Sequence, residues 1–233
     1  EARGGAALLS ANLPIVLATP LGGPLGDLTL SCISDTDRLD ELSFDLPVGA
    51  GDERDDGRRL LGRDLASCLG TPRPDGPYSA THLQSVRALP ILPLRGYFTG
   101  AIDLIFRAPI EGRMRWFVAD YKTNVLGERG ADGRTLASRP SHYGPAGMTA
   151  EMCKKHYDLQ YTLYLLALHR FLRLRLPGYD YDRDMGGSYY LFVRGMLGPD
   201  TAPGHGVFYD RPPRAVIERL DGLFATPPAE GPS

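Results

Sequence analysis

The sequence predicts an α/β domain with a mixed central sheet flanked by helices. The first observation is a pair of strand-like segments, 96–107 and 115–126, which are rich in β-branched and aromatic residues. A proline, a glycine and charged residues separate them, so we expect an antiparallel hairpin. The second observation is a helical pattern that begins at Thr149, continues with Leu159, Leu163 and Leu166 at helical spacing, and stops at Pro177. Strands and helices therefore both contribute to the core.

Three other segments complete the predicted elements. Residues 38–47 alternate between apolar and polar side chains, which predicts a half-buried strand. Residues 187–194 form a β-rich run that is predicted to add another strand. Residues 213–224 predict a closing helix with a proline in its first turn.

The length of the chain is sufficient for one core. With 233 residues and 42% hydrophobic content, we expect one domain over residues 38–224. Residues 1–37 are expected to be an irregular segment and residues 225–233 a disordered tail. The first residue is Glu1, and we expect the chain to be a fragment of a longer polypeptide.

Charge and cysteine content narrow the function classes. The net charge of −2 gives no overall basic character, so any contact with nucleic acid must come from a local basic patch or from another part of an assembly. The three cysteines lie far apart without C-x-x-C spacing, which argues against a disulfide framework, a zinc site or an iron–sulfur site built from them. No apolar run approaches the roughly 18 residues of a membrane helix. We therefore expect a cytoplasmic protein.

Acidic residues stand on both strands of the predicted hairpin. Asp103 lies between Ile102 and Leu104, and Asp120 ends the second apolar run. Because strand side chains alternate between faces, Asp120 and Lys122 are expected to point the same way. Aspartate is disfavoured in strands, and two close carboxylates repel each other unless a cation lies between them.

A hard divalent cation would resolve this repulsion. Mg²⁺ and Mn²⁺ take oxygen ligands, so Asp103 and Asp120 are candidate ligands, and the pattern suits phosphodiester hydrolysis assisted by Lys122. The spacing alone fits a second interpretation equally well, in which Asp120 and Lys122 form an ion pair at a strand end and Asp103 caps a turn.

The motif Gly100-Ala101-Ile102-Asp103, followed by Asp120-Tyr121-Lys122, resembles the core of the PD-(D/E)xK nucleases in the version found in the RecB nuclease family. The segment from Tyr157 to Tyr164 resembles the Q-x-x-x-Y motif of that family, and 186–195 resembles the nuclease domain of exodeoxyribonuclease V beta subunits. The resemblance is dense over about residues 96–224. It implies a restriction-endonuclease-like fold and a Mg²⁺-dependent deoxyribonuclease.

The resemblance also implies site residues. Asp103 and Asp120 would hold Mg²⁺, together with the backbone carbonyl of Tyr121 and, with less support, Glu41. Mn²⁺ is an alternative, and Ca²⁺ would bind without supporting cleavage. The catalytic residues that the resemblance implies are Asp103, Asp120, Lys122, Gln160 and Tyr164.

The predicted long helix is the most basic element of the chain. Its candidates for contact with single-stranded DNA are Lys154, Lys155, Arg170 and Arg173. By resemblance, the whole enzyme would be an ATP-dependent helicase–nuclease that acts on unwound DNA ends in recombinational repair. ATP would serve only a helicase part upstream of this chain, and the gamma and alpha subunits of exodeoxyribonuclease V would be its partners.

The chain departs from the family pattern in one respect. RecB-type nucleases add a metal-binding histidine from a helix upstream of the strand that carries Glu41, whereas the first histidine here is His82. We expect that helix to precede residue 1 and the isolated chain to cut slowly or not at all. Two alternatives remain: a non-catalytic module for DNA guidance or subunit docking, and a stand-alone restriction-like endonuclease.

Overall fold

The computed structural model describes residues 12–48, 59–60, 62–72, 78–90, 92–93, 96–127, 130 and 138–224. The strands are β1 (Arg38–Val48), β2 (Arg59–Leu60), β3 (Leu92–Pro93), β4 (Gly96–Ile110), β5 (Arg113–Lys122), β6 (Met185–Phe192) and β7 (Val207–Asp210). The helices are α2 (Gly62–Leu69), α3 (Ala80–Arg87), α4 (Pro145–Lys154), α5 (Tyr157–Arg175), α6 (Tyr181–Asp184) and α7 (Arg214–Phe224). Short 3₁₀ turns connect several of them, among them η4 (Pro140–Tyr143).

The central sheet has five strands in the order β1-β4-β5-β6-β7. The predicted hairpin is confirmed, with β4 and β5 antiparallel and joined by a turn at Glu111 and Gly112, both of which have positive φ angles. Strand β6 pairs in parallel with β5, and β7 returns antiparallel to β6. The sheet is therefore mixed, and with helices around it the fold is α/β and consistent with a restriction-endonuclease-like core, as predicted.

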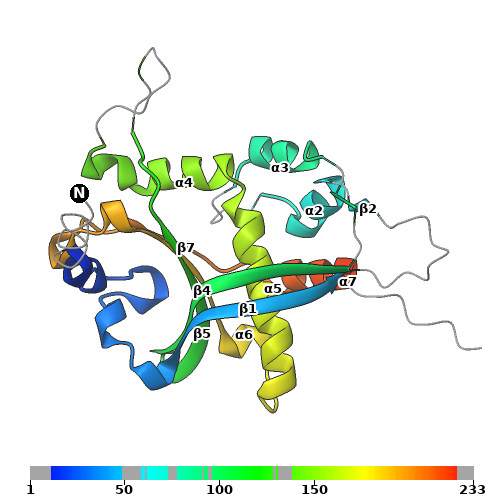
Figure 1. The fold of residues 1–233 in the computed structure, drawn as a ribbon, viewed down its shortest axis with the longest axis horizontal. Helices are drawn as coiled ribbons and strands as arrows, with labels where there is room; N and C mark the ends of the chain where they lie inside the picture. The colour runs from blue at the N-terminus through cyan, green and yellow to red at the C-terminus, as the bar shows by residue number, and fades with distance from the viewer. Residues whose placement is uncertain are drawn as a thin grey trace, which may run out of the picture.

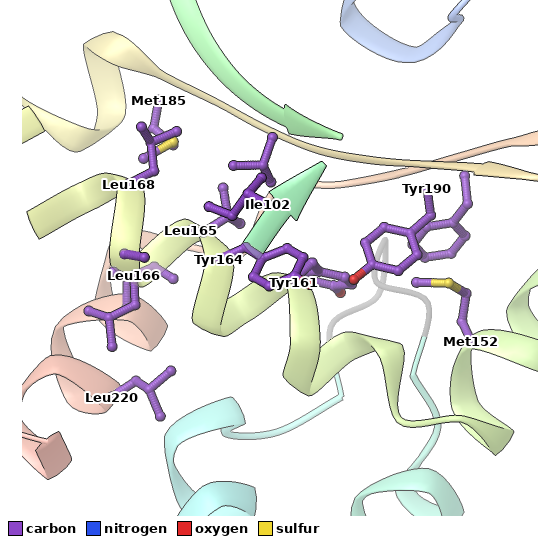
Figure 2. Packing of buried hydrophobic residues seen from close by; sticks show 14 of the residues in the cluster. Ile102, Met152, Tyr161, Tyr164, Leu165, Leu166, Leu168, Met185, Tyr190 and Leu220 are labelled. Carbon is purple, nitrogen blue, oxygen red and sulfur yellow. The ribbon is translucent and has the colours of Figure 1, made fainter. Parts of the chain in front are cut away.

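Helix α5 packs against one face of the sheet. Figure 2 shows Tyr161, Leu165 and Leu168 of this helix among side chains from β4 and β6, including Ile102 and Tyr190. The sequence alternation of β1 has the expected result over residues 41–46, because Leu42, Phe44 and Leu46 pack on this cluster while the polar residues between them are exposed. The long helix and the sheet together fix the position of the residues between them.

The opposite face of the sheet is covered by residues that precede β1. Leu21, Leu25, Leu30 and Ile33 are buried against a cluster that contains Phe106 and other side chains of β4, β5 and β6. Figure 1 shows this segment in blue beside the sheet. Residues 12–37 contain a short helix over 12–17, 3₁₀ turns and bends, and several of their apolar side chains belong to the core. The predicted tail at 225–233 and residues 1–11 lie outside the described residues.

The prediction of a single helix from Thr149 was wrong. Helix α4 already begins at Pro145, and the chain then breaks at His156, whose φ of 50° is left-handed, before α5 begins at Tyr157. Proline at the first turn favours the earlier start. Strand β7 was not predicted because its four residues are too few to show a pattern. Among the described residues, no helix combines the length and apolar character needed to cross a membrane.

We expect Ile33→Val to lower the free energy of unfolding by about 1 kcal/mol, because it removes one buried methylene from the cluster under the sheet. Denaturant unfolding measures this effect. Ile15→Val is the matched control in the same segment, since Ile15 is 43% exposed and its change should stay within about 0.5 kcal/mol. Equal effects for the two variants would show that the segment is not packed as described.

Candidate metal centre

The two predicted acids lie where strands β4 and β5 separate. The pair at this end of the ladder is Leu104 with Ala119, and each of these residues is the sequence neighbour of one of the two aspartates, Asp103 and Asp120. Beyond this point β4 continues beside β1, while β5 continues beside β6 as far as Lys122. One connection remains across the gap, since the Tyr121 N–H donates a hydrogen bond to Asp103 Oδ2 at 2.9 Å. The sheet thus opens at the position of the carboxylates.

Glu41 lies next to this opening. The pairs Asp40–Leu104 and Leu42–Ile102 on either side place Glu41 opposite Asp103 in the register of β1 and β4. Glu41 has a φ of 54°, which is costly for a residue with a Cβ atom. The alternation of β4 also breaks here, because Ile102 and Leu104 belong to the clusters on opposite faces of the sheet. Strain and repeated negative charge therefore coincide at one point.

Asp120 and Lys122 point to the α5 face, as the alternation predicts, and both are buried. Their carboxylate and ammonium groups form a close ion pair. Burial raises the pKa of the Asp120 carboxyl; the ammonium of Lys122 opposes this shift, and the charge of Asp103 adds to it. The carboxylate of Asp120 is therefore held in a position where its negative charge is only partly compensated.

Gln160 connects Lys122 to the aromatic residues around it. Its Oε1 accepts hydrogen bonds from Lys122 Nζ at 3.1 Å and from the Tyr190 hydroxyl at 2.9 Å. Its Nε2 donates to the Tyr164 hydroxyl at 2.8 Å, one turn later on α5. Burial, with the charge of Asp120, raises the pKa of Tyr164 to about 12, so its hydroxyl remains protonated near neutral pH. All five residues of the predicted catalytic group thus lie in or beside one network.

The donor set suits a hard divalent cation. Asp103, Asp120 and Glu41 supply carboxylate oxygens, the ligands that Mg²⁺ and Mn²⁺ prefer. The buried Oδ2 of Asp120 receives no well-aligned hydrogen bond from the described residues, although the Lys122 ammonium lies against it. Burial is the main cause of the raised pKa of Asp120, and a cation between Asp103 and Asp120 would offset both this cost and the smaller repulsion from Asp103. The metal ligands, including the Tyr121 carbonyl, remain a prediction.

The predicted DNA-binding residues do not form one patch. Arg170 and Arg173 both bind Asp221 of α7, at 2.5 and 3.1 Å, near the end of α5 that lies away from Gln160. Lys154 pairs with Glu151 on its own helix at 3.5 Å. Lys155 is exposed at the end of α4. The arginines therefore connect α5 to α7 in this structure, and their predicted DNA contact is without structural support.

The sequence reasoning gave no role to two aromatic side chains that surround Lys122. The Lys122 Nζ lies 4.0 Å from the ring centroid of Tyr157 and 4.8 Å from that of Tyr190, in cation–π contact with each. Tyr190 is the direct neighbour of Asp120 in the parallel β5–β6 ladder. Knowing that β5 and β6 pair in parallel would have placed Tyr190 beside Asp120. No local sequence pattern shows which strands pair across 70 residues.

No protein-family model matches the chain. The protein from Mycobacterium tuberculosis (strain H37Rv) described as RecBCD enzyme subunit RecB is 43% identical over 214 residues, which is 88% of this chain and 18% of that protein. The chain is homologous to RecB. The Escherichia coli (strain K12) RecB protein is 35% identical over 207 residues, covering 88% of the chain and 15% of that protein.

A third RecB protein, from Haemophilus influenzae (strain Rd), is 43% identical over 143 residues, covering 61% of the chain and 10% of that protein. The chain therefore spans less than a fifth of the length of these RecB relatives. The similarity to RecB agrees with the resemblance expected from the Asp103, Asp120 and Lys122 motif.

Proposed function

We propose that this chain is the metal-dependent DNA nuclease part of a RecB-type protein that acts in recombinational repair of DNA. The observation that carries the proposal is the arrangement of Asp103, Asp120 and Lys122 at the point where β4 and β5 separate. Homology to RecB over most of the chain supports it, as does the family resemblance of the same residues.

Each residue has a defined part in the proposed hydrolysis. Asp103 and Asp120 would hold Mg²⁺, which would polarise the scissile phosphate and lower the pKa of a bound water. Lys122 carries a positive charge at the edge of this site and would orient the attacking water or stabilise charge that develops on the phosphate. Gln160 and the rings of Tyr157 and Tyr190 hold the Lys122 ammonium in place.

A groove next to Gln160 is the proposed path for the DNA strand. It is lined by Thr99 and Gly100 of β4 on one side, and by Gln160, Leu163 and Tyr164 of α5 on the other. Gly100 has no room for a side chain here, since a Cβ atom would lie 2.6 Å from the Phe44 ring. The Tyr164 hydroxyl and the Gln160 amide lie on the α5 side of the groove, where they could exchange hydrogen bonds with a passing phosphate or sugar.

The proposed protein partners are inferred from the names of the relatives, and no surface of this chain is used to identify them. Because the relatives are named as subunits of the RecBCD enzyme, we propose that this chain works within such a complex, with exodeoxyribonuclease V gamma and alpha subunits and an upstream ATP-dependent helicase part. The absence of a contiguous basic patch among the described residues of α5 is consistent with DNA being delivered by other parts of such an assembly.

The test is degradation of linear single-stranded DNA in the presence of Mg²⁺, Mn²⁺ or Ca²⁺. This chain is compared with a polypeptide extended upstream to include a further histidine-bearing helix. We expect the extended form to cut with Mg²⁺ or Mn²⁺ and not with Ca²⁺, and this chain to cut more slowly or not at all. If neither form cuts, and DNA affinity is unchanged when Asp103 and Asp120 are both replaced by asparagine, the non-catalytic alternative is correct.

A further inference from the structure

A second cluster of metal-ligand side chains lies on the other side of α5, away from Lys122. His82 of α3, His156 at the break between α4 and α5, and Asp158 in the first turn of α5 each offer one ligand atom, and these atoms all lie within 4.8 Å of one another. The imidazole rings of His82 and His156 are 5.4 Å apart between centroids. Three separate elements therefore converge on this point.

Two of the three residues of the cluster are buried, and His156 is half-buried. Asp158 is completely inaccessible to solvent and His82 is 5% exposed. His82 Nε2 and Asp158 Oδ2 are 2.7 Å apart and share a hydrogen bond. Two further atoms have no hydrogen-bond partner among the described residues: the Oδ1 of Asp158 and the Nδ1 of His156. A buried carboxylate oxygen without a hydrogen-bond partner is energetically costly. The cluster therefore has two atoms that could bind a metal ion and that no described residue pairs with.

A His–Asp hydrogen bond alone explains only part of this arrangement. It accounts for His82 Nε2 and Asp158 Oδ2, but His156 would then gain nothing from its position. His156 has a left-handed φ of 50° where the chain could have continued as a regular helix. This conformation turns the chain between α4 and α5 and brings its ring to His82, in keeping with the observation that backbone strain is retained where it serves a site.

We propose that His82, His156 and Asp158 form a binding site for a divalent transition-metal ion of the Zn²⁺ class. Two imidazole nitrogens and one carboxylate oxygen are a donor set that Zn²⁺ accepts, and nitrogen ligands disfavour Mg²⁺. Tetrahedral coordination at about 2.0 Å separates ligand atoms by roughly 3.3 Å, so small side-chain movements from the present spacing suffice. Binding at Nε2 of His82 displaces the proton that this atom shares with Asp158, and that proton passes to Nδ1 of the ring or to solvent.

The site would stabilise the start of α5. Asp158 lies two residues before Gln160, and the helix presents the two side chains to different neighbours: His82 on one side and Lys122 on the other. A metal ion that ties α3 to the α4–α5 break would fix the first turn of α5 and thereby the position of Gln160. This role is independent of the proposed nuclease chemistry, because it depends on stability and not on cleavage.

The test is direct titration of the chelator-treated, metal-free chain with Zn²⁺, with Mg²⁺ in excess so that oxygen-only sites are occupied. We expect one Zn²⁺ per chain and a higher melting temperature. His156→Asn should weaken Zn²⁺ binding by about 100-fold or more. Loss of a residue that only supports a metal ligand already costs roughly 10- to 100-fold in affinity, and His156 would itself be a ligand. Asparagine tolerates the left-handed conformation, so this variant should keep the backbone. Co²⁺ in place of Zn²⁺ should give visible absorption in the wild-type chain and lose it in the variant.

His205→Asn is the matched control, since His205 is partly buried and lies in the turn before β7. It should bind Zn²⁺ as the wild-type chain does, and so should Asp120→Asn, which leaves the second cluster unchanged. His82→Gln adds a further ligand deletion, and its loss of Zn²⁺ binding counts only if circular dichroism shows a folded protein. Absence of Zn²⁺ binding by the wild-type chain, or equal binding by His156→Asn, would overturn the proposal.

Discussion

Asp120→Asn is expected to reduce metal-dependent DNA cleavage by about a thousandfold in the form of the protein that cuts. Metal polarisation of a phosphate contributes several kcal/mol to transition-state stabilisation, and each 1.36 kcal/mol corresponds to a factor of ten in rate. Asparagine keeps the size and shape of the side chain but removes the charge that would hold the cation beside Asp103. Initial rates at saturating Mg²⁺ measure the effect.

The control for this prediction is Asp27→Asn, which removes one exposed carboxylate from the segment before β1 and should leave the rate unchanged. Asp103→Asn should resemble Asp120→Asn, because both residues would share one cation. Glu41→Gln should have a smaller effect, since Glu41 is exposed and lies at the edge of the opening. A wild-type rate in Asp120→Asn, with the protein folded, would falsify the proposed mechanism.

The fold should survive the Asp120→Asn substitution. When its carboxylate partner is neutralised, the Lys122 ammonium keeps its hydrogen bond to the Gln160 carbonyl oxygen and its cation–π contacts with two tyrosine rings. The pKa of Asp120 is raised in the folded state, so folding favours the protonated, neutral form of this side chain. The Asp120 carboxyl therefore contributes most to stability below its unfolded pKa, where it is protonated. This contribution is lost as the pH rises through its folded pKa. Circular dichroism and a thermal melt check that lost activity is not lost structure.

Local patterns predicted the strands that carry the site. The side chains that face the core set the alternation in β1 and the aromatic and β-branched runs of β4 and β5. Such patterns can be recognised in a stretch of about ten residues. The same alternation correctly placed Asp120 and Lys122 on one face. Repulsion between carboxylates led to the prediction that Asp103 shares a cation with Asp120, and this remains a prediction; the pKa of Asp120 is raised mainly by burial, with a smaller contribution from the charge of Asp103.

Features that depend on distant contacts could not be predicted in this way. The break at His156 was missed because Met152 and Leu159 keep a helical spacing across it, while the left-handed turn brings the His156 ring into contact with His82 of α3. The pairing of Arg170 and Arg173 with Asp221 joins residues about 50 positions apart. A row of basic residues on one helix therefore predicted a DNA surface where the fold instead uses part of it to hold α7.

Lys122→Met is expected to lower the cleavage rate by about 100- to 1,000-fold while the chain retains its metal affinity. Methionine fills a similar volume between Tyr157 and Tyr190 but supplies no charge to orient water or to stabilise the phosphate. It also leaves Asp120 without its ammonium partner, so the carboxylate should bind a divalent cation at least as tightly as before.

Separate measurements of the two quantities distinguish a chemical role for Lys122 from a structural one. Calorimetric titration with Mn²⁺ gives the affinity, and single-turnover cleavage at saturating Mn²⁺ gives the rate of the chemical step. Arg87→Met is the control, because Arg87 is an exposed cation at the end of α3 with no part in the proposed site. A rate that falls while affinity holds places Lys122 in the chemistry. If rate and affinity fall together, Lys122 supports the structure of the site, and the aspartates alone would carry the proposed hydrolysis.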